Sequence, residues 1–414
     1  MTEFPHPPLS KGYGRSVDTP LLLALVALLV FGLIMLFSAS WDFSMIYFDS
    51  PMYLFMRQLL WMVLGTAAAL ILSRFDYHHW QKLVVLIMLI TIAMLIGVLF
   101  MNELRPGPRR SLYGGSIQPS ELAKLITVIY LAVWLYAKRD HLHDIQLGLI
   151  PLGIILGIIG GFIYLQPDLS AAATVFILGG LLFFLAGGDL KQIIFLLVAA
   201  MIAGWIIVKL NTTGHQRIME YLAGIKDPTQ ASYHVRRSLE AIAKGGFFGV
   251  GIGRATTKFL GLPLPPTDSI FAVIAEELGL SGCIILIALY GILVWRGLVI
   301  AHRSPDMLGT LLASGLVFWI GIEALINMTV MVGLLPFAGN ALPFISAGGS
   351  NLTVSLAAIG ILMNISRHHG ESTVTTENEW RSYGATTDLR RRNRWRRLPR
   401  TRRSRATEGS NIED

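Results

Sequence analysis

Residues 20–39 read PLLLALVALLVFGLIMLFSA, a stretch without a charged side chain. A helix needs about 20 apolar residues to cross the hydrocarbon core of a bilayer, so this stretch predicts a transmembrane helix. It lacks a short hydrophobic core with an A-x-A-type cleavage site, and we expect it to remain in the chain. Of 414 residues, 53% are hydrophobic and 14% charged, against about 25% charged in soluble domains. This composition excludes a soluble domain, a disordered chain and a nucleic-acid-binding domain as the main body.

Hydropathy divides the chain into a series of candidate spans. They lie at residues 20–40, 53–73, 82–102, 119–137, 147–165, 170–187, 191–210, 269–295, 306–332 and 347–366. We therefore predict an all-α polytopic membrane protein with about ten transmembrane helices. A large extracytoplasmic loop, 211–268, separates helices 7 and 8. Residues 1–18 form a cytoplasmic N-terminal segment, 19–368 the membrane domain and 369–414 a tail.

The basic residues of the loops predict the orientation. They gather in the N-terminal segment and in alternate loops. Segment by segment, these basic residues are Lys11 and Arg15, Arg74 and Lys82, Lys138 and Arg139, Lys191, and Arg296 and Arg303. By the positive-inside rule these loops and both termini are cytoplasmic. One outer loop breaks the pattern with Arg105, Arg109 and Arg110. These arginines are either a candidate anion site or merely solvated side chains.

The formal net charge of +8 belongs to the tail, because residues 381–414 hold eleven arginines and four acids and the rest of the chain carries +1. The tail from residue 369 is rich in Ser, Thr, Asn and Arg, which predicts disorder. We expect it to bind anionic inner-leaflet lipid, at about 1 kcal/mol for each basic residue near the surface. Nucleic acid is the weaker alternative, since Trp395 is the one aromatic residue of the basic run.

Ionisable side chains inside spans cost roughly 2.5–3.5 kcal/mol each and indicate function. They are Arg57, Glu121, Lys124, Glu276, Glu277 and Glu323. Glu121 and Lys124 share a helix face and can neutralise each other. With Asp168 and Asp268 at span ends, these groups gather at the outer face and have no inner-side counterpart. That distribution favours work on an anionic, lipid-embedded substrate, in which a carboxylate base acts beside cations that hold a phosphate or pyrophosphate.

The long loop contains two further patterns. Val235, Leu239 and Ile242 recur at helical spacing opposite charged residues, which predicts an amphipathic helix at the membrane interface. The glycines that follow, from Gly245 to Gly253, match neither a P-loop nor a dinucleotide fingerprint. We interpret them as a flexible or closely packed turn at the membrane surface.

Four motifs occur in order and together resemble one known family. They are Gln118-Pro-Ser-Glu-Leu-Ala-Lys124, Gln166-Pro-Asp-Leu169, Pro266-Thr-Asp-Ser-Ile-Phe271 with Glu276-Glu-Leu-Gly279, and Leu342-Pro-Phe-Ile-Ser-Ala-Gly-Gly-Ser350. Residues 20–366 thereby resemble the SEDS family of shape, elongation, division and sporulation proteins, which includes FtsW and RodA. The resemblance implies ten transmembrane helices in the bacterial cytoplasmic membrane. It also implies a peptidoglycan glycosyltransferase that polymerises lipid II, with a class B penicillin-binding protein as transpeptidase partner.

The resemblance also implies site residues. Asp268 matches the family's essential aspartate and would deprotonate the acceptor hydroxyl of lipid II, which then attacks the undecaprenyl-pyrophosphate-linked glycan. Candidate pyrophosphate contacts are Arg110, Lys124 and Lys258. Positions around the family's central cavity are matched by Glu121, Lys124, Gln166, Asp168, Ser346, Gly348, Gly349 and Ser350. The reaction needs no ATP, and a divalent cation, Mg²⁺ or Mn²⁺, stays an open question at this point.

The sequence departs from the family at Ser111, Ser269 and Ala347, where aromatic residues are usual. Two other functions therefore remain as hypotheses. One is a lipid II flippase or another transporter. The other is a non-catalytic scaffold of the divisome or elongasome, in which Thr267 or Asp268 only caps the eighth span. The motifs are shared between division and elongation proteins and do not separate these two roles.

Overall fold

The computed structural model describes residues 18–103, 118–166, 168–210 and 212–368. Contacts divide the chain into two units, Met1–His369 and Gly370–Asp414, and the described residues all belong to the first. The predicted tail therefore lies outside the described residues. So do the three arginines of the outer loop and Ser111.

The described residues form helices and contain no strand. The α-helices are α1 (Thr19–Phe48), α2 (Tyr53–Leu72), α3 (Trp80–Glu103), α4 (Pro119–Lys138), α5 (Ile150–Leu165), α6 (Leu169–Leu185), α7 (Leu190–Leu210), α8 (Thr212–Lys226), α9 (Tyr233–Gly245), α10 (Ile270–His302), α11 (Met307–Met331) and α12 (Gly349–Arg367). Short 3₁₀ turns are η1 (Tyr77–His79), η2 (Arg139–His141) and η4 (Pro228–Gln230), and η3 (Ile145–Leu149) is a π-helical turn.

The predicted all-α membrane fold is confirmed. Among the described residues, eight helices are long and apolar enough to cross a membrane, and the shorter apolar stretches Leu169–Leu185 of α6 and Leu190–Ile206 of α7 accompany them. Helix starts follow the local sequence. Asp18 caps α1 by accepting a hydrogen bond from the Leu21 amide at 3.0 Å, and Pro20 follows in the first turn. Asp306 caps α11 in the same way through the Gly309 amide.

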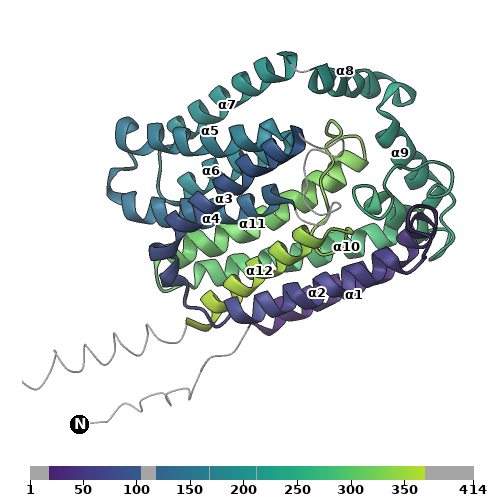
Figure 1. Ribbon diagram of the computed structural model, residues 1–414, viewed down its shortest axis with the longest axis horizontal. Helices are drawn as coiled ribbons and strands as arrows, with labels where there is room; N and C mark the ends of the chain where they lie inside the picture. Colours follow the sequence, from purple (N-terminus) through teal and green to yellow (C-terminus); the bar gives the residue numbers. More distant parts are fainter. Residues whose placement is uncertain (1–17, 104–117, 167, 211, 369–414) are drawn as a thin grey trace, which may run out of the picture. The chain divides into compact units, whose positions relative to one another are not determined.

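The centre of the bundle is formed by α4, α11 and α12, which bury most of their residues, whereas the apolar stretches of α2 and α3 bury fewer than a third of theirs. Figure 1 shows α12 beside α2, and these two helices approach closely. A Cβ atom on Gly360 would lie 2.5 Å from the Ala69 carbonyl oxygen. Helices that pack in a membrane commonly use such small residues, because lipid provides no hydrophobic force to bring helices together.

The helices define two ends of the bundle. At the α9 end, α1 ends and α4, α10 and α12 begin; at the Asp306 end, α10 and α12 end and α11 begins. The predicted amphipathic helix is confirmed as α9, which buries Val235, Ser238 and Ala241 on one face. Helix α8 precedes it within the long loop.

Candidate functional site

The start of α4 places a buried ion-pair cluster in the bundle. Pro119 opens the helix, Glu121 lies in its first turn and Lys124 one turn later. Lys124 Nζ lies 3.0 Å from Glu121 Oε2, which confirms the predicted pair, and it also contacts Glu323 Oε1 of α11. Lys124 and Glu323 are each 1% exposed. A buried ammonium needs such partners, since an unpaired charge in a low-dielectric interior is costly.

Asp168 connects α6 to α4. Its Oδ1 atom caps α6 by accepting from the Ala171 amide at 3.1 Å and from Ser170 Oγ at 3.0 Å. Its Oδ2 atom accepts from Gln118 Nε2 at 3.1 Å and from Ser120 Oγ at 3.4 Å. The carboxylate therefore fixes the start of both helices relative to each other.

The start of α12 completes this cluster. The Gln118 amide donates to Ser350 Oγ at 3.1 Å, and Asn351 Nδ2 donates to Glu121 Oε2 at 3.1 Å. Gly349 lies against Trp61, where a Cβ atom would come within 2.4 Å of the indole. The predicted residues Glu121, Lys124, Asp168 and Ser350 thus come together at one place.

The segment that carries Asp268 is bound to the loop before α12. Ser346 Oγ donates to the Thr267 carbonyl at 2.7 Å, and the Ala347 amide donates to the Pro266 carbonyl at 2.8 Å. Gln58 of α2 holds the same loop from the other side. It donates to the Ser346 carbonyl at 3.1 Å and accepts from the Gly348 amide at 3.2 Å. Asp268 itself is half-buried.

The hypothesis that Thr267 or Asp268 caps the eighth span is wrong. The residue at the cap position of α10 is Ser269, and it makes no side-chain cap hydrogen bond. Ser269 Oγ instead donates to the Pro263 carbonyl at 2.8 Å. The Ser269 side chain therefore bonds back to the preceding loop rather than to the first turn of α10.

Two asparagines join the Asp268 segment to Asp168. Asn327 Nδ2 donates to the Asp268 carbonyl at 3.0 Å and to the Asn340 carbonyl at 2.6 Å. Asn340 Oδ1 accepts from Ser170 Oγ at 3.2 Å, and Ser170 contacts Asp168. The sequence criterion missed Gln58 and Asn327 because it counted only ionisable side chains in spans, and amide side chains in the same apolar helices were the signal that could have found them. Asn340 lies on the connection between α11 and α12, outside the spans to which the criterion was applied.

Two predicted residues lie elsewhere. Gln166 is fully buried and donates to the Leu95 carbonyl of α3 at 3.0 Å. Lys258 Nζ lies 3.1 Å from Glu277 Oε1 of α10 and donates to the Ser38 carbonyl of α1 at 3.0 Å. The side chain of Lys258 is 4% exposed, so it forms a second buried ion pair. Arg110 lies outside the described residues.

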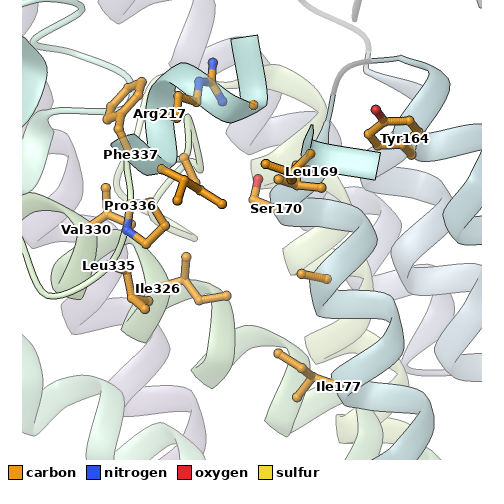
Figure 2. A pocket seen from close by; sticks show the side chains of 15 residues that line it. Tyr164, Leu169, Ser170, Ile177, Arg217, Ile326, Val330, Leu335, Pro336 and Phe337 are labelled. Carbon is orange, nitrogen blue, oxygen red and sulfur yellow. The ribbon is translucent and has the colours of Figure 1, made fainter. Parts of the chain in front are cut away.

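An apolar cavity of about 330 Å³ adjoins the network. Figure 2 shows Ser170 and Leu169 of α6 on one side and Ile326, Val330, Leu335, Pro336 and Phe337 opposite, with Arg217 of α8 above. Ser170 is shared between this cavity and the Asp168 network. An apolar space beside polar groups suits a ligand with a hydrocarbon chain and a charged head.

Among the described residues, no three or more His, Cys, Asp or Glu side chains gather into a group that could hold a metal ion. Mg²⁺ is usually bound by only one or two carboxylates together with substrate phosphates, so this observation does not exclude a divalent cation. We assign no step of the reaction to a metal.

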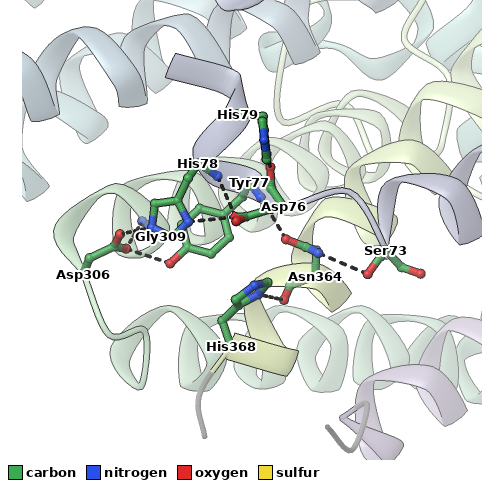
Figure 3. Close-up of polar contacts among 9 residues, drawn as sticks. All are labelled: Ser73, Asp76, Tyr77, His78, His79, Asp306, Gly309, Asn364 and His368. Atoms are coloured by element: carbon green, nitrogen blue, oxygen red, sulfur yellow. Dashed lines mark hydrogen bonds and ion pairs between the residues drawn. The ribbon is translucent and has the colours of Figure 1, made fainter. Parts of the chain in front are cut away.

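The charged side chains that the bundle buries lie toward the α9 end. They are Glu121, Lys124, Asp168, Glu276, Glu277 and Glu323. Among the described residues, this agrees with the expectation that the ionisable groups of the spans have no counterpart at the other end, where the charged side chains lie on connections and are partly exposed. Figure 3 shows His78 between Asp76, at 2.7 Å, and Asp306, at 2.9 Å. These three side chains are 27–46% exposed and lie on connections between helices. The gathering of charged side chains toward the α9 end thus holds for the buried ones, whose burial costs free energy.

Comparisons with known proteins agree with one another. The family model for FtsW, RodA and SpoVE, described as cell cycle protein, matches residues 19–371. Stage V sporulation protein E of Bacillus subtilis is 36% identical over 85% of this chain and 98% of its own length. A probable peptidoglycan glycosyltransferase FtsW of Trichlorobacter lovleyi is 37% identical over 84% of this chain and 93% of its own.

Solved structures show the same fold. A chain of a peptidoglycan synthase complex that coordinates polymerization and crosslinking is 25% identical with a TM-score of 0.72, covering 86% of this chain and 99% of that one. The rod shape determining protein RodA of Thermus thermophilus is 23% identical with a TM-score of 0.61, covering 86% and 98%.

Proposed function

Because the chain belongs to the FtsW/RodA/SpoVE family, we propose that it is a peptidoglycan glycosyltransferase that polymerises lipid II into β-1,4-linked glycan strands in cell division or cell elongation. Relatives named probable peptidoglycan glycosyltransferase FtsW, at 34–37% identity, support the reaction class. One observation in this chain carries the proposal. A hydrogen-bonded network joins the Asp268 segment to the buried charges of α4 and α6, beside an apolar cavity.

In this reaction Asp268 is the general base. Its carboxylate takes the proton of the GlcNAc 4-hydroxyl of the acceptor lipid II, and that oxygen attacks the anomeric carbon of the donor glycan. The bond from the anomeric carbon to pyrophosphate breaks, and undecaprenyl pyrophosphate leaves with the electron pair. The donor is α-linked, so the β product inverts the configuration. General-base catalysis contributes about 10²- to 10⁴-fold to such a rate.

The cationic contacts to pyrophosphate divide into two kinds. Lys124 and Lys258 are each paired with buried glutamates, so either must exchange a carboxylate for phosphate oxygens to act directly. Arg110 precedes Gln118 in the connection that leads to α4. An arginine presents a planar fork of donors that matches phosphate oxygens. We assign Arg110 the direct contact, and Lys124 and Lys258 the placement of α4 and of the Asp268 loop.

The apolar cavity gives the lipid carrier a place near the reacting groups. Ser170 lies on its wall and hydrogen-bonds Asp168, so a prenyl segment in the cavity would bring its pyrophosphate toward the α4 start. The surroundings of the pyrophosphate are then shaped through the contacts described above, which involve Gln118, Ser346, Gly348, Gly349 and Ser350.

The chain is a multi-pass protein of the bacterial cytoplasmic membrane with the α9 end outside and both termini inside. Its alternating basic loops support this orientation. A class B penicillin-binding protein is the transpeptidase partner, which the likeness to a synthase complex that couples polymerization and crosslinking supports. The arginine-rich tail then meets anionic inner-leaflet lipid and no nucleic acid.

A polymerisation assay tests the proposal. Purified chain with its transpeptidase partner should convert lipid II to glycan strands, and Asp268→Asn should lower the rate about 10²-fold or more at unchanged thermal stability. Asp189→Asn, on the α6–α7 connection, is the matched control and should leave the rate unchanged. Full activity of Asp268→Asn would contradict the assigned base, and vesicles that translocate lipid II without making polymer would favour the transporter. Localisation to the septum or to the side wall distinguishes division from elongation.

A further inference from the structure

The turn after α9 exposes a group of large apolar side chains. Five of them, here called the apolar face, are Phe247, Phe248, Ile252, Phe259 and Leu260, and they are 55–81% exposed. Soluble surfaces rarely present so many large apolar groups together. These side chains belong to the long loop rather than to a span, so the position of the loop decides what covers them.

The loop is rigid because it completes a broken helix. Helix α10 is interrupted at Gly279, whose φ of 68° and ψ of −162° are not helical. The freed carbonyls of Glu276 and Glu277 accept from the amides of Val250 and Gly251, both at 3.0 Å. The freed amides of Leu280 and Ser281 donate to the carbonyls of Gly246 and Phe247 at 3.0 and 3.1 Å. Non-helical backbone at membrane depth is stable only when its polar groups are paired in this way.

The glycines of the loop permit this contact. A Cβ atom on Gly249 would lie 2.2 Å from the Glu277 carbonyl oxygen, and one on Gly279 would lie 2.4 Å from the Gly249 amide nitrogen. Of the two interpretations given to the glycine run, the closely packed turn is therefore confirmed. Side chains hold the loop as well, because Glu276 accepts from the Thr256 amide at 2.8 Å and Glu277 pairs with Lys258.

The neighbouring helices α1 and α10 show how far along the bundle the contact between the loop and α10 lies. At the Asp306 end, Arg296 of α10 pairs with Asp18, the cap of α1, at 2.5 Å. At the loop, Lys258 contacts Ser38 of α1. Ser38 lies about 20 residues beyond Asp18 and Glu276 about 20 residues before Arg296, which is about 30 Å of helix. The hydrocarbon core of a bilayer is about 30 Å thick, so taking the Asp18–Arg296 pair as one boundary of that core places the loop at the other.

We propose that the loop 246–260 inserts its apolar face into the leaflet at the α9 end, with phospholipid acyl chains as the occupant. Arg254 is exposed beside it, and so is Lys244, which pairs with Glu240 at 3.1 Å, and these basic residues suit lipid headgroup phosphates at the same level. Apolar side chains of interfacial segments enter a leaflet by about 5–10 Å. The inserted loop fixes the height of the Asp268 segment above the membrane, and this last consequence alone rests on the proposed function.

Depth-dependent fluorescence quenching tests the insertion without any activity readout. The full chain, in a Cys283→Ala background, carries Phe248→Cys labelled with an environment-sensitive fluorophore in nanodiscs of phosphatidylglycerol and phosphatidylcholine. We expect blue-shifted emission and stronger quenching by lipids with a nitroxide on the acyl chain than by a water-soluble quencher. Thr229→Cys on the exposed η4 turn is the control and should show the reverse.

A second position protects the result against a local effect of the label. Ile252→Cys should behave like Phe248→Cys, since both side chains belong to the apolar face. Water-like emission at both positions in nanodiscs overturns the proposal. It is also overturned if both positions become shielded only after a transpeptidase partner is added, because a protein would then be the occupant.

Discussion

At the scale of single residues, Lys124 decides the state of two buried carboxylates. Its ammonium contacts Glu121 and Glu323, and all three groups are buried. Removing one partner of a buried pair leaves an uncompensated charge, at a cost of about 3–5 kcal/mol. We therefore predict that Lys124→Met lowers the free energy of unfolding by that amount, measured by thermal or denaturant unfolding in detergent.

The same helix offers a control for this variant. Lys138→Met, at the exposed end of α4, should change stability little. The double variant Lys124→Met with Glu323→Gln should recover part of the loss, since it removes one of the two unpaired charges. If Lys124→Met instead keeps full stability and only loses polymerisation, its role is direct contact with substrate.

His234 makes the region around α9 sensitive to acid. Burial lowers the pKa of its imidazole, the Arg217 charge lowers it further, and its ring stacks on Phe337 at 4.0 Å. The unfolded chain then binds a proton at His234 more readily than the folded one, so stability falls with pH below the ordinary value of about 6.5 and the loss levels off below the folded pKa. We predict a melting temperature that drops between pH 7.5 and 5.5 by more than in His234→Phe. Parallel pH profiles of the two proteins would contradict this.

At the scale of elements, the break in α10 depends on two glycines. Gly279→Ala places a Cβ atom 2.4 Å from the Gly249 amide nitrogen and forces a left-handed φ on a residue that avoids it. We predict a loss of about 1–3 kcal/mol in unfolding free energy from backbone strain alone, with polymerisation reduced as the Asp268 loop shifts. Gly291→Ala, on the same helix and with nothing within 4 Å of its Cβ, should have little effect. Equal losses of unfolding free energy in both variants would contradict this prediction, because α10 would then be sensitive to any glycine substitution.

These elements also show what a sequence can and cannot predict. Hydropathy located the apolar helices because each must pair its own backbone groups inside a bilayer, which is a local property. The Glu121–Lys124 pair could be predicted because residues three apart lie on the same face of a helix, which is also a local property. Glu323, Asn327 and Asn340 could not be placed, since their partners are distant in the sequence. The break at Gly279 is hidden within a continuous apolar run because the turn after α9, not the helix itself, pairs its freed groups.

At the scale of the whole molecule, the charge is divided between a near-neutral body and an arginine-rich tail. Because basic residues near an anionic surface gain about 1 kcal/mol each, we predict that the chain purifies with bound phosphatidylglycerol through this tail. Replacing the arginines of 390–405 with glutamine should reduce the phosphatidylglycerol retained, as measured by mass spectrometry at low salt, and should leave thermal stability unchanged. Retention that is equal in the two proteins and indifferent to salt would contradict the prediction.

The η4 turn between α8 and α9 has a practical consequence. Asp227 accepts from the Thr229 amide at 3.0 Å and from Gln230 Nε2 at 3.2 Å, so the turn closes on itself, and its residues are exposed or nearly so. Self-contained exposed turns tolerate added sequence better than turns that other elements depend on. An epitope inserted there would lie on the extracytoplasmic face of the membrane in the proposed orientation, and antibody staining of spheroplasts could follow the protein without disturbing its termini.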